Sequence, residues 1–104
     1  MRALLIILLV SATAAAEERN ACPRGARFRG VAIDLDVKGA DIHDVFRVLA
    51  QVGKINIVVP DDVKANVTLT VKKVPWDQVA CTIVAMHKLR LEIDGNVMLV
   101  MPSR

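Results

Sequence analysis

Apolar and polar positions change their spacing several times along residues 31–102 of this chain. Residues 31–38 alternate between large apolar residues and small or polar ones, which predicts a strand with one buried face. In residues 41–52 the apolar positions recur every three or four residues, which predicts an amphipathic helix with Asp41 as its N-cap. The pair at 39–40 contains a glycine and predicts a turn. The folded part therefore opens with a strand followed by a helix.

The second half repeats this alternation of periods. Gly53 is placed to close the first helix as its C′ residue, and Pro75 presets the first turn of a second helix. The remaining predicted elements are a strand at 55–59, a turn at 61–62, a strand at 67–71, and strands at 91–93 and 97–101 around a tight turn at 94–96. The expected fold class is α+β with the order βαββαββ. A length of 104 residues limits the chain to a compact single domain.

The inward positions of these elements supply the expected core. Trp76 is the only tryptophan and the chain has no tyrosine, so we expect Trp76 to anchor the core rather than to contact a ligand. With two phenylalanines besides, the chain lacks a stacking platform for sugars or bases. The predicted core anchors are Ile33, Leu35, Val45, Phe46, Leu49, Trp76, Val79 and Ile83.

The first thirty residues depart from this pattern. Residues 1–16 have a basic start, an apolar run too short to span a membrane, and a small-residue end, which predicts a cleaved signal peptide. Residues 17–30 lack periodicity and predict a mobile leader. The domain at 31–102 holds no second long apolar run. We therefore expect an exported protein with no direct membrane span.

The formal charge of +3 is concentrated in the leader, which carries four arginines against two glutamates. Residues 31–102 hold eight basic and nine acidic residues, so the folded part is close to neutral. A short basic tail on an exported chain is not the footprint of a nucleic-acid-binding protein. The leader is either simply solvated or touches an acidic partner or headgroup.

The sequence offers no constellation for catalysis or for binding a metal. His43 and His87 are the only histidines, and no cluster of cysteines and histidines at ligand spacing accompanies them. A solvated strand face and a helix cap account for the acidic run of Asp34, Asp36, Asp41 and Asp44. We therefore predict that the protein is not an enzyme and takes no cofactor.

Cys22 and Cys81 are the two cysteines of the chain. Two cysteines in an exported protein favour a disulfide. Cys81 falls off the apolar face of the second helix, and Cys22 lies in a leader that needs an anchor, so a bond between them would fasten the leader to that helix. The sequence does not show the geometry, so two free thiols remain the alternative.

Five pieces of the chain, in this order, carry a resemblance to a known family: residues 33–50 (IDLDVKGADIHDVFRVLA), 55–60 (INIVVP), 67–71 (VTLTV), 74–78 (VPWDQ) and 95–100 (GNVMLV). They resemble the short N-terminal domain shared by secretins and TonB-dependent signalling receptors. The likeness is greatest to the secretins of type IV pili and type II secretion. It implies two helices sandwiched between two small sheets, in a periplasmic domain that precedes an outer-membrane barrel and contacts other proteins.

The resemblance implies a non-enzymatic protein–protein interaction module, an accessory of a secretion, pilus or transport system at the outer membrane. The implied partner is a secretin, an inner-membrane secretion or pilus component, or a TonB-linked regulator, and the module could also self-associate. Because the sequence stops at 104 without a barrel, we expect only the interaction role to carry over. The alternative is a standalone structural remnant of a secretin without transport activity. The expected contact is the exposed side of a helix or a strand edge, and the candidate edge lies at Val67 and Leu69 or at Val97 and Leu99.

Overall fold

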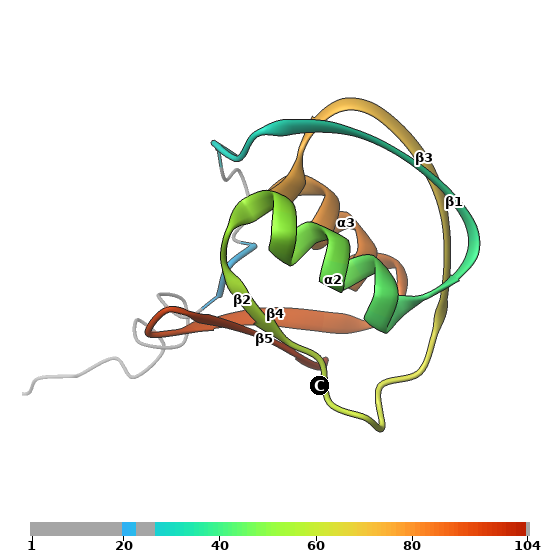
Figure 1. The fold of residues 1–104 in the computed structure, drawn as a ribbon. Helices are drawn as coiled ribbons and strands as arrows, with labels where there is room; N and C mark the ends of the chain where they lie inside the picture. Colours follow the sequence, from blue (N-terminus) through green and yellow to red (C-terminus); the bar gives the residue numbers. More distant parts are fainter. Residues whose placement is uncertain (1–19, 23–26, 104) are drawn as a thin grey trace, which may run out of the picture.

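The computed structural model describes residues 20–22 and 27–103, and in it two helices lie between two small sheets (Figure 1). The sheet above the helices pairs β1 (Ala32–Asp41) with β3 (Asn66–Pro75), and the sheet below them has the order β2 (Asn56–Val58), β5 (Val97–Pro102), β4 (Leu89–Asp94). The helices are α2 (Ile42–Gly53) and α3 (Trp76–Met86). The predicted α+β class and the order βαββαββ are confirmed. The signal-peptide prediction at 1–16 lies outside the described residues.

β1 and β3 form a curved antiparallel pair that arches over both helices (Figure 1). Each strand has ten residues, more than their alternation predicted. Two register shifts interrupt the pairing, and a residue with positive φ lies in each, Gly39 on β1 at 64° and Lys73 on β3 at 56°. Such bulges bend a strand and increase its twist. The predicted turn at 39–40 is therefore wrong, because Gly39 serves a bulge and the strand continues to Asp41.

The lower sheet joins the two halves of the chain. β5 is its central strand, parallel to β2 on one side and antiparallel to β4 on the other. Gly95, with φ of 63°, begins the two-residue turn of the β4–β5 hairpin, where a side chain would be strained. The pairing of β2 with β5 brings together segments about 40 residues apart, so no local pattern could have predicted it.

Asp41 caps α2 as predicted, because its carboxylate accepts a hydrogen bond from the backbone N–H of His43 at 2.8 Å. The end of α2 differs from the prediction. Lys54, not Gly53, adopts the left-handed conformation and closes the helix with φ of 54°. Gly53 stays helical, and its lack of a side chain serves a close packing contact described below.

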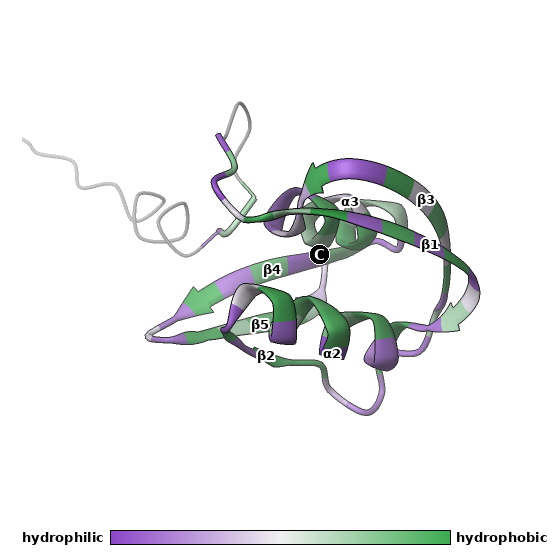
Figure 2. Cartoon of the chain, turned by 45° about the horizontal axis from the view of Figure 1, so that its top comes forward, coloured by the Kyte–Doolittle hydropathy of each residue, from purple (hydrophilic) through white to green (hydrophobic). Residues whose placement is uncertain are grey.

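The core lies between the helices and the two sheets, and alternating polar and apolar bands run along β1 and β3 (Figure 2). Six of the eight proposed anchors are buried: Val45, Phe46, Leu49, Trp76, Val79 and Ile83. Ile33 and Leu35 are only half-buried and pack against the core from β1. They stay partly open because β1 has a neighbouring strand on one side only. Across residues 20–22 and 27–103, no helix is both long enough and apolar enough to cross a membrane.

The cap of α2 gives a stability prediction. Replacing Asp41 with alanine leaves the N–H of His43 without its acceptor, so we expect the free energy of unfolding to fall by about 1 kcal/mol. Asp44→Ala is the matched control, because its ion pair with Arg47 is solvent-exposed and contributes about 0.3–0.5 kcal/mol. Urea unfolding followed by circular dichroism measures both. Equal losses in the two variants would show that Asp41 does not act as a cap.

Candidate interaction surface

Strand edges are where this fold leaves backbone hydrogen-bonding groups free to pair with another chain. β5 has a neighbour on each side, so the edge predicted at Val97 and Leu99 is wrong. The side chains of these two residues are half-buried, and their strand is the centre of the lower sheet. Sequence reasoning missed this because the parallel pairing with β2 is non-local. In the described residues, the edges to consider belong to β1, β3, β2 and β4.

β1 and β3 each have one unpaired side, because their sheet contains only these two strands. At ten residues each, they are the longest such edges in the described part of the chain, whereas β2 has three residues. Val67 is fully buried and Leu69 half-buried, so both side chains face the core. At these positions the residues that face outward are Thr68 and Thr70. At Val67 and Leu69, β3 therefore offers a partner only its backbone groups, because the side chains are directed into the core.

The outer face of the arch is polar, and its side chains bond across the strand pair. The Thr70 hydroxyl donates to the Asp36 carboxylate at 2.9 Å, and the Lys73 N–H donates to Asp34 at 2.8 Å. The Gly39 N–H donates to the Thr68 hydroxyl oxygen at 2.8 Å. The last two bonds lie at the two bulges, so these side chains fix the bend of the arch.

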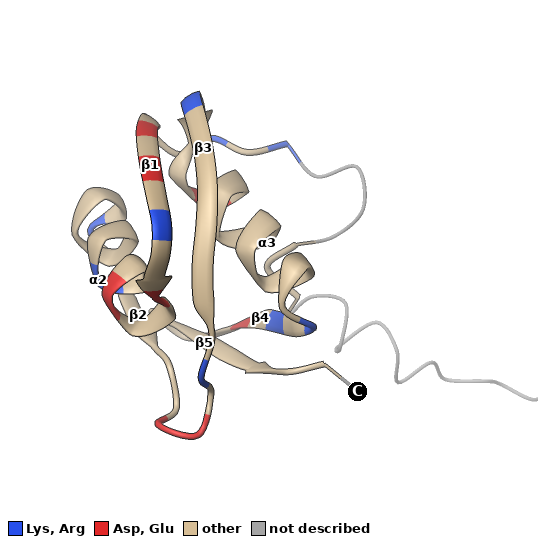
Figure 3. Cartoon of the chain, turned by 90° about the vertical axis from the view of Figure 1, so that its right-hand side faces the viewer, with Lys and Arg blue, Asp and Glu red and all other residues tan. Residues whose placement is uncertain are grey.

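Charges of both signs lie along the same face. Figure 3 shows β1 and β3 side by side, with acidic and basic positions on β1 and a basic position at one end of β3. Asp34 and Asp36 thus lie on a solvent-exposed face, as the sequence predicted, and they also accept hydrogen bonds from β3. These bonds fix the pairing of β1 with β3, while the other side of the β3 backbone stays unpaired.

The outer edge of β4 is covered by the chain itself. Asn20 forms an isolated antiparallel bridge with Glu92, and the Ala21 N–H donates to the Leu91 carbonyl at 3.1 Å. Residues 20 and 21 therefore lie against the outer side of β4 through one isolated β-bridge and one hydrogen bond. The leader was predicted to be mobile unless it is tied to the fold, and residues 20–22 are tied to it by these contacts.

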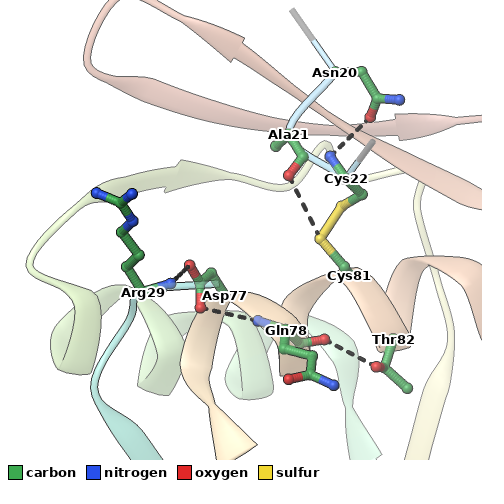
Figure 4. The surroundings of a disulfide bond; sticks show 8 residues. All are labelled: Asn20, Ala21, Cys22, Arg29, Asp77, Gln78, Cys81 and Thr82. Atoms are coloured by element: carbon green, nitrogen blue, oxygen red, sulfur yellow. Dashed lines mark hydrogen bonds between the residues drawn. A yellow bond between two sulfur atoms is a disulfide. The ribbon is translucent and has the colours of Figure 1, made fainter. Parts of the chain in front are cut away.

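The predicted disulfide is present and fastens this segment to α3 (Figure 4). Cys22 and Cys81 are bonded with their Cα atoms 5.7 Å apart. The Cys81 sulfur also lies 3.7 Å from the Ala21 carbonyl oxygen, a contact rather than a hydrogen bond because a bonded sulfur carries no hydrogen. One turn earlier on α3, Asp77 accepts from the N–H groups of Arg29 and Gly30 at 3.3 and 3.2 Å. The leader is thus held at two points on one helix.

The disulfide contributes more to this attachment than the hydrogen bond to β4 does. One backbone hydrogen bond stabilises by about 0.5–1.5 kcal/mol. Ordering the backbone of each residue costs about 1–2 kcal/mol, and residues 20–22 are three. The hydrogen bond from Ala21 to Leu91 therefore offsets only part of this cost, and the packing of Ala21 and Cys22 against the core offsets more of it. The disulfide is the strongest of these attachments.

The curated proteins that this chain resembles in sequence include secretins of type IV pili. The type IV pilus biogenesis and competence protein PilQ of Neisseria gonorrhoeae is 34% identical over 77 residues, which are 74% of this chain and 11% of the relative. The fimbrial assembly protein PilQ of Pseudomonas aeruginosa is 32% identical over 76 residues, 73% of this chain and 11% of the relative. The chain is homologous to type IV pilus secretins. It spans about a tenth of the length of these curated relatives, and no family model matches it.

Solved structures agree with this homology. The competence pilus secretin PilQ of Vibrio cholerae matches with a TM-score of 0.59 and 34% identity, over 65% of this chain and 16% of that chain. The N0 domain of the type II secretin from enterotoxigenic Escherichia coli matches with a TM-score of 0.61 and 12% identity, over 70% of this chain and 96% of that domain. The second likeness shows the fold alone. The secretin resemblance drawn from the five sequence pieces is confirmed.

The secretin-like domain packs its single tryptophan between two glycines. A Cβ atom built on Gly53 would lie 2.5 Å from the Trp76 ring carbons Cε2 and Cζ2, and one on Gly30 would lie 2.5 Å from Cδ1 and Nε1. The Trp76 N–H donates to the Val31 carbonyl at 2.9 Å. The indole therefore joins α2, α3 and the start of β1, which explains why glycine stands at both positions.

The described residues of the secretin-like domain line several surface cavities. A cavity of about 330 Å³ beside the start of α2 is lined by Asp41, His43, Asp61, Lys64, Ala65 and Asn66. The His43 Nε2 atom lies 2.8 Å from the Val63 carbonyl oxygen, so the ring is engaged in holding the 59–65 loop. Among residues 20–22 and 27–103, no three His, Cys, Asp or Glu side chains gather as metal ligands would.

Proposed function

We propose that this chain is a periplasmic, non-enzymatic protein–protein interaction module of a pilus or secretion system. Its homology to type IV pilus secretins supports the system. The open edges of the β1–β3 arch support the mode of contact. The partner we favour is a secretin or an inner-membrane component of the same system, with association at the outer membrane. A TonB-linked regulator is the less favoured partner, because the relatives above are pilus secretins.

The observation that carries the proposal is the outer edge of β3. β3 pairs with β1 on one side only, and its inward side chains are committed to the core. An extended segment of a partner can add to such an edge through backbone hydrogen bonds, and outward side chains then give specificity. The run 66–71 precedes the bulge at Lys73 and keeps a regular register with β1, apart from the shift at Gly39. This run is the proposed contact.

Placing a charge on that run tests the proposal. Thr70→Lys puts a cation beside the outer backbone of β3, which is how natural edge strands avoid pairing. Gln51→Lys is the matched control, because it adds the same charge at an exposed position of α2. Each tagged variant is used to capture proteins from a periplasmic extract of the source cells, and the captured proteins are identified by mass spectrometry.

We expect the unmodified chain and Gln51→Lys to recover a secretin, pilus or secretion component. Thr70→Lys should recover at least tenfold less of it, which corresponds to a loss of about 1.4 kcal/mol in binding free energy. Thr70 also donates to Asp36, so Thr70→Val serves as a second variant that removes this bond without adding charge. If Thr70→Val loses as much as Thr70→Lys, the edge is not the contact. Recovery of no such component by any form would favour the structural remnant instead.

A further inference from the structure

We propose that the outer edge of β4 is a second strand-addition site, which the Cys22–Cys81 disulfide keeps closed by holding residues 20–22 against it. This edge lies in the lower sheet, whereas the contact proposed above lies in the β1–β3 arch. The inference therefore stands whether or not β3 binds a partner. The occupant is an extended segment of a partner protein, antiparallel to β4.

The molecule itself shows what this edge accepts. Asn20 bridges Glu92 in antiparallel orientation, and Ala21 donates to the Leu91 carbonyl. β4 has six residues and only its inner side is paired with β5, and residues 20–22 bond to its outer side at Leu91 and Glu92. An incoming strand would make the same kind of backbone bond and could extend it along the whole of β4.

Residues 20–22 form part of the lining of two surface hollows. One, of about 200 Å³, is lined by Asn20 together with Arg90, Leu91 and Glu92 of β4. The other, of about 540 Å³, lies over α3 and is lined by Cys22, Phe28, Gln78, Cys81, Thr82, Ala85 and Met86. Departure of residues 20–22 removes one wall of each hollow and widens both. Met86, which lines the second, is 51% exposed.

Reduction of the disulfide is the chemistry that would open the edge. Both cysteines line the larger hollow, and both residues are partly exposed. A dithiol reductant attacks one sulfur as a thiolate and forms a mixed disulfide, and its second thiol then displaces the protein sulfur. The reductant becomes an intramolecular disulfide, and the two electrons and two protons it gives up leave Cys22 and Cys81 as thiols. Residues 20–22 are then held at β4 by non-covalent contacts alone, so a competing strand can displace them.

The test uses a full chain that cannot close the edge again. In Ala21→Pro/Cys22→Ser the disulfide is absent, and proline has no N–H to donate to Leu91. The probe is a synthetic peptide of residues 18–24 with serine in place of the cysteine, acetylated and amidated. The control probe is the same peptide methylated on the Ala21 nitrogen. Binding is followed by NMR amide shifts and hydrogen exchange along β4.

Binding at the outer edge changes the exchange of only those β4 backbone N–H groups that point away from β5. The backbone N–H and C=O groups of Leu91 point away from β5, because its carbonyl accepts from Ala21. Backbone directions alternate along a strand, so those of Leu89 and Ile93 also point away from β5, whereas those of Arg90 and Glu92 point toward it. We expect the peptide to slow exchange of the outward N–H groups at least about fivefold in the double variant, with no effect on oxidised wild type. The methylated peptide should have no effect on either protein.

Equal shifts in oxidised wild type, or no shifts in the double variant, would overturn the proposal. Concentration-dependent dimerisation of the double variant through β4 would also overturn it, because the occupant would then be a second copy of the chain. Should the double variant unfold, wild type reduced with dithiothreitol replaces it. There the Ala21 N–H, which donates to the Leu91 carbonyl, should exchange about five- to thirtyfold faster than in the oxidised protein, and an unchanged rate would contradict release of the segment.

Discussion

Replacing Trp76 with alanine is expected to lower the free energy of unfolding by about 3–5 kcal/mol. The indole is 8% exposed and lies between α2, α3 and the start of β1, so its removal leaves a cavity that several elements border. A domain of this size is stable by about 5–15 kcal/mol, so the expected loss is a substantial part of that margin. Urea unfolding of the two proteins, followed by circular dichroism, measures the difference.

Gly53→Ala tests the same contact with a smaller change. An alanine methyl at this position would lie 2.5 Å from two Trp76 ring carbons, so the ring must move, and we expect a loss of about 1–3 kcal/mol. Glycine to alanine inside a helix usually stabilises by about 0.5–1 kcal/mol. The sign of the change in the free energy of unfolding therefore distinguishes the two effects. A gain in stability would show that the Trp76 ring does not pack closely against Gly53.

Reduction of the Cys22–Cys81 disulfide is expected to have an effect of similar size. The bond joins residues 59 apart, and closing such a loop stabilises by about 4 kcal/mol in the chain-entropy account. The lower end of the observed range, about 2 kcal/mol, is the least loss we expect. Urea unfolding with and without dithiothreitol gives the value directly.

Two serine variants separate the bond from the packing of its sulfurs. Cys22→Ser and Cys81→Ser each remove the same disulfide, so we expect them to lose the same stability as reduction does, and to lose nothing further when reductant is added. A loss confined to Cys81→Ser would assign the effect to the surface of α3. A loss below about 1 kcal/mol in both would contradict the role given to the bond.

Local patterns predicted most of the elements, and the exceptions have a common cause. The alternation in 31–38 and 67–71 and the helical spacing in 41–52 each reflect a face that the strand or helix buries. Gly39 and Gly53 were both interpreted from local rules for turns and helix ends. The structure assigns Gly39 to a bulge opposite β3 and Gly53 to a contact with Trp76. Both roles depend on partners remote in sequence.

The candidate surface shows the same division. The hypothesis of a disulfide came from the export prediction and from the place of Cys81 on its helix, both of which are local, and the structure decides between it and two free thiols. The exclusion of Val97 and Leu99 as an edge depends on the parallel pairing of β5 with β2. The cover of β4 by Asn20 and Ala21 comes from a stretch with no periodicity at all. Strand neighbours, and therefore edges, are set by topology rather than by the pattern within one strand.

The most direct test of the central claim, contact through the β1–β3 arch, is cross-linking at lysine in the source cells followed by mass spectrometry. The exposed lysines divide into two sets, with Lys38, Lys64, Lys72 and Lys73 on the arch or next to it, and Lys54 and Lys88 elsewhere. The account predicts cross-links from Lys64, Lys72 or Lys73 to a secretin, pilus or secretion protein, and at least tenfold fewer from the second set. Cross-links to such a protein from Lys54 or Lys88 alone would contradict it.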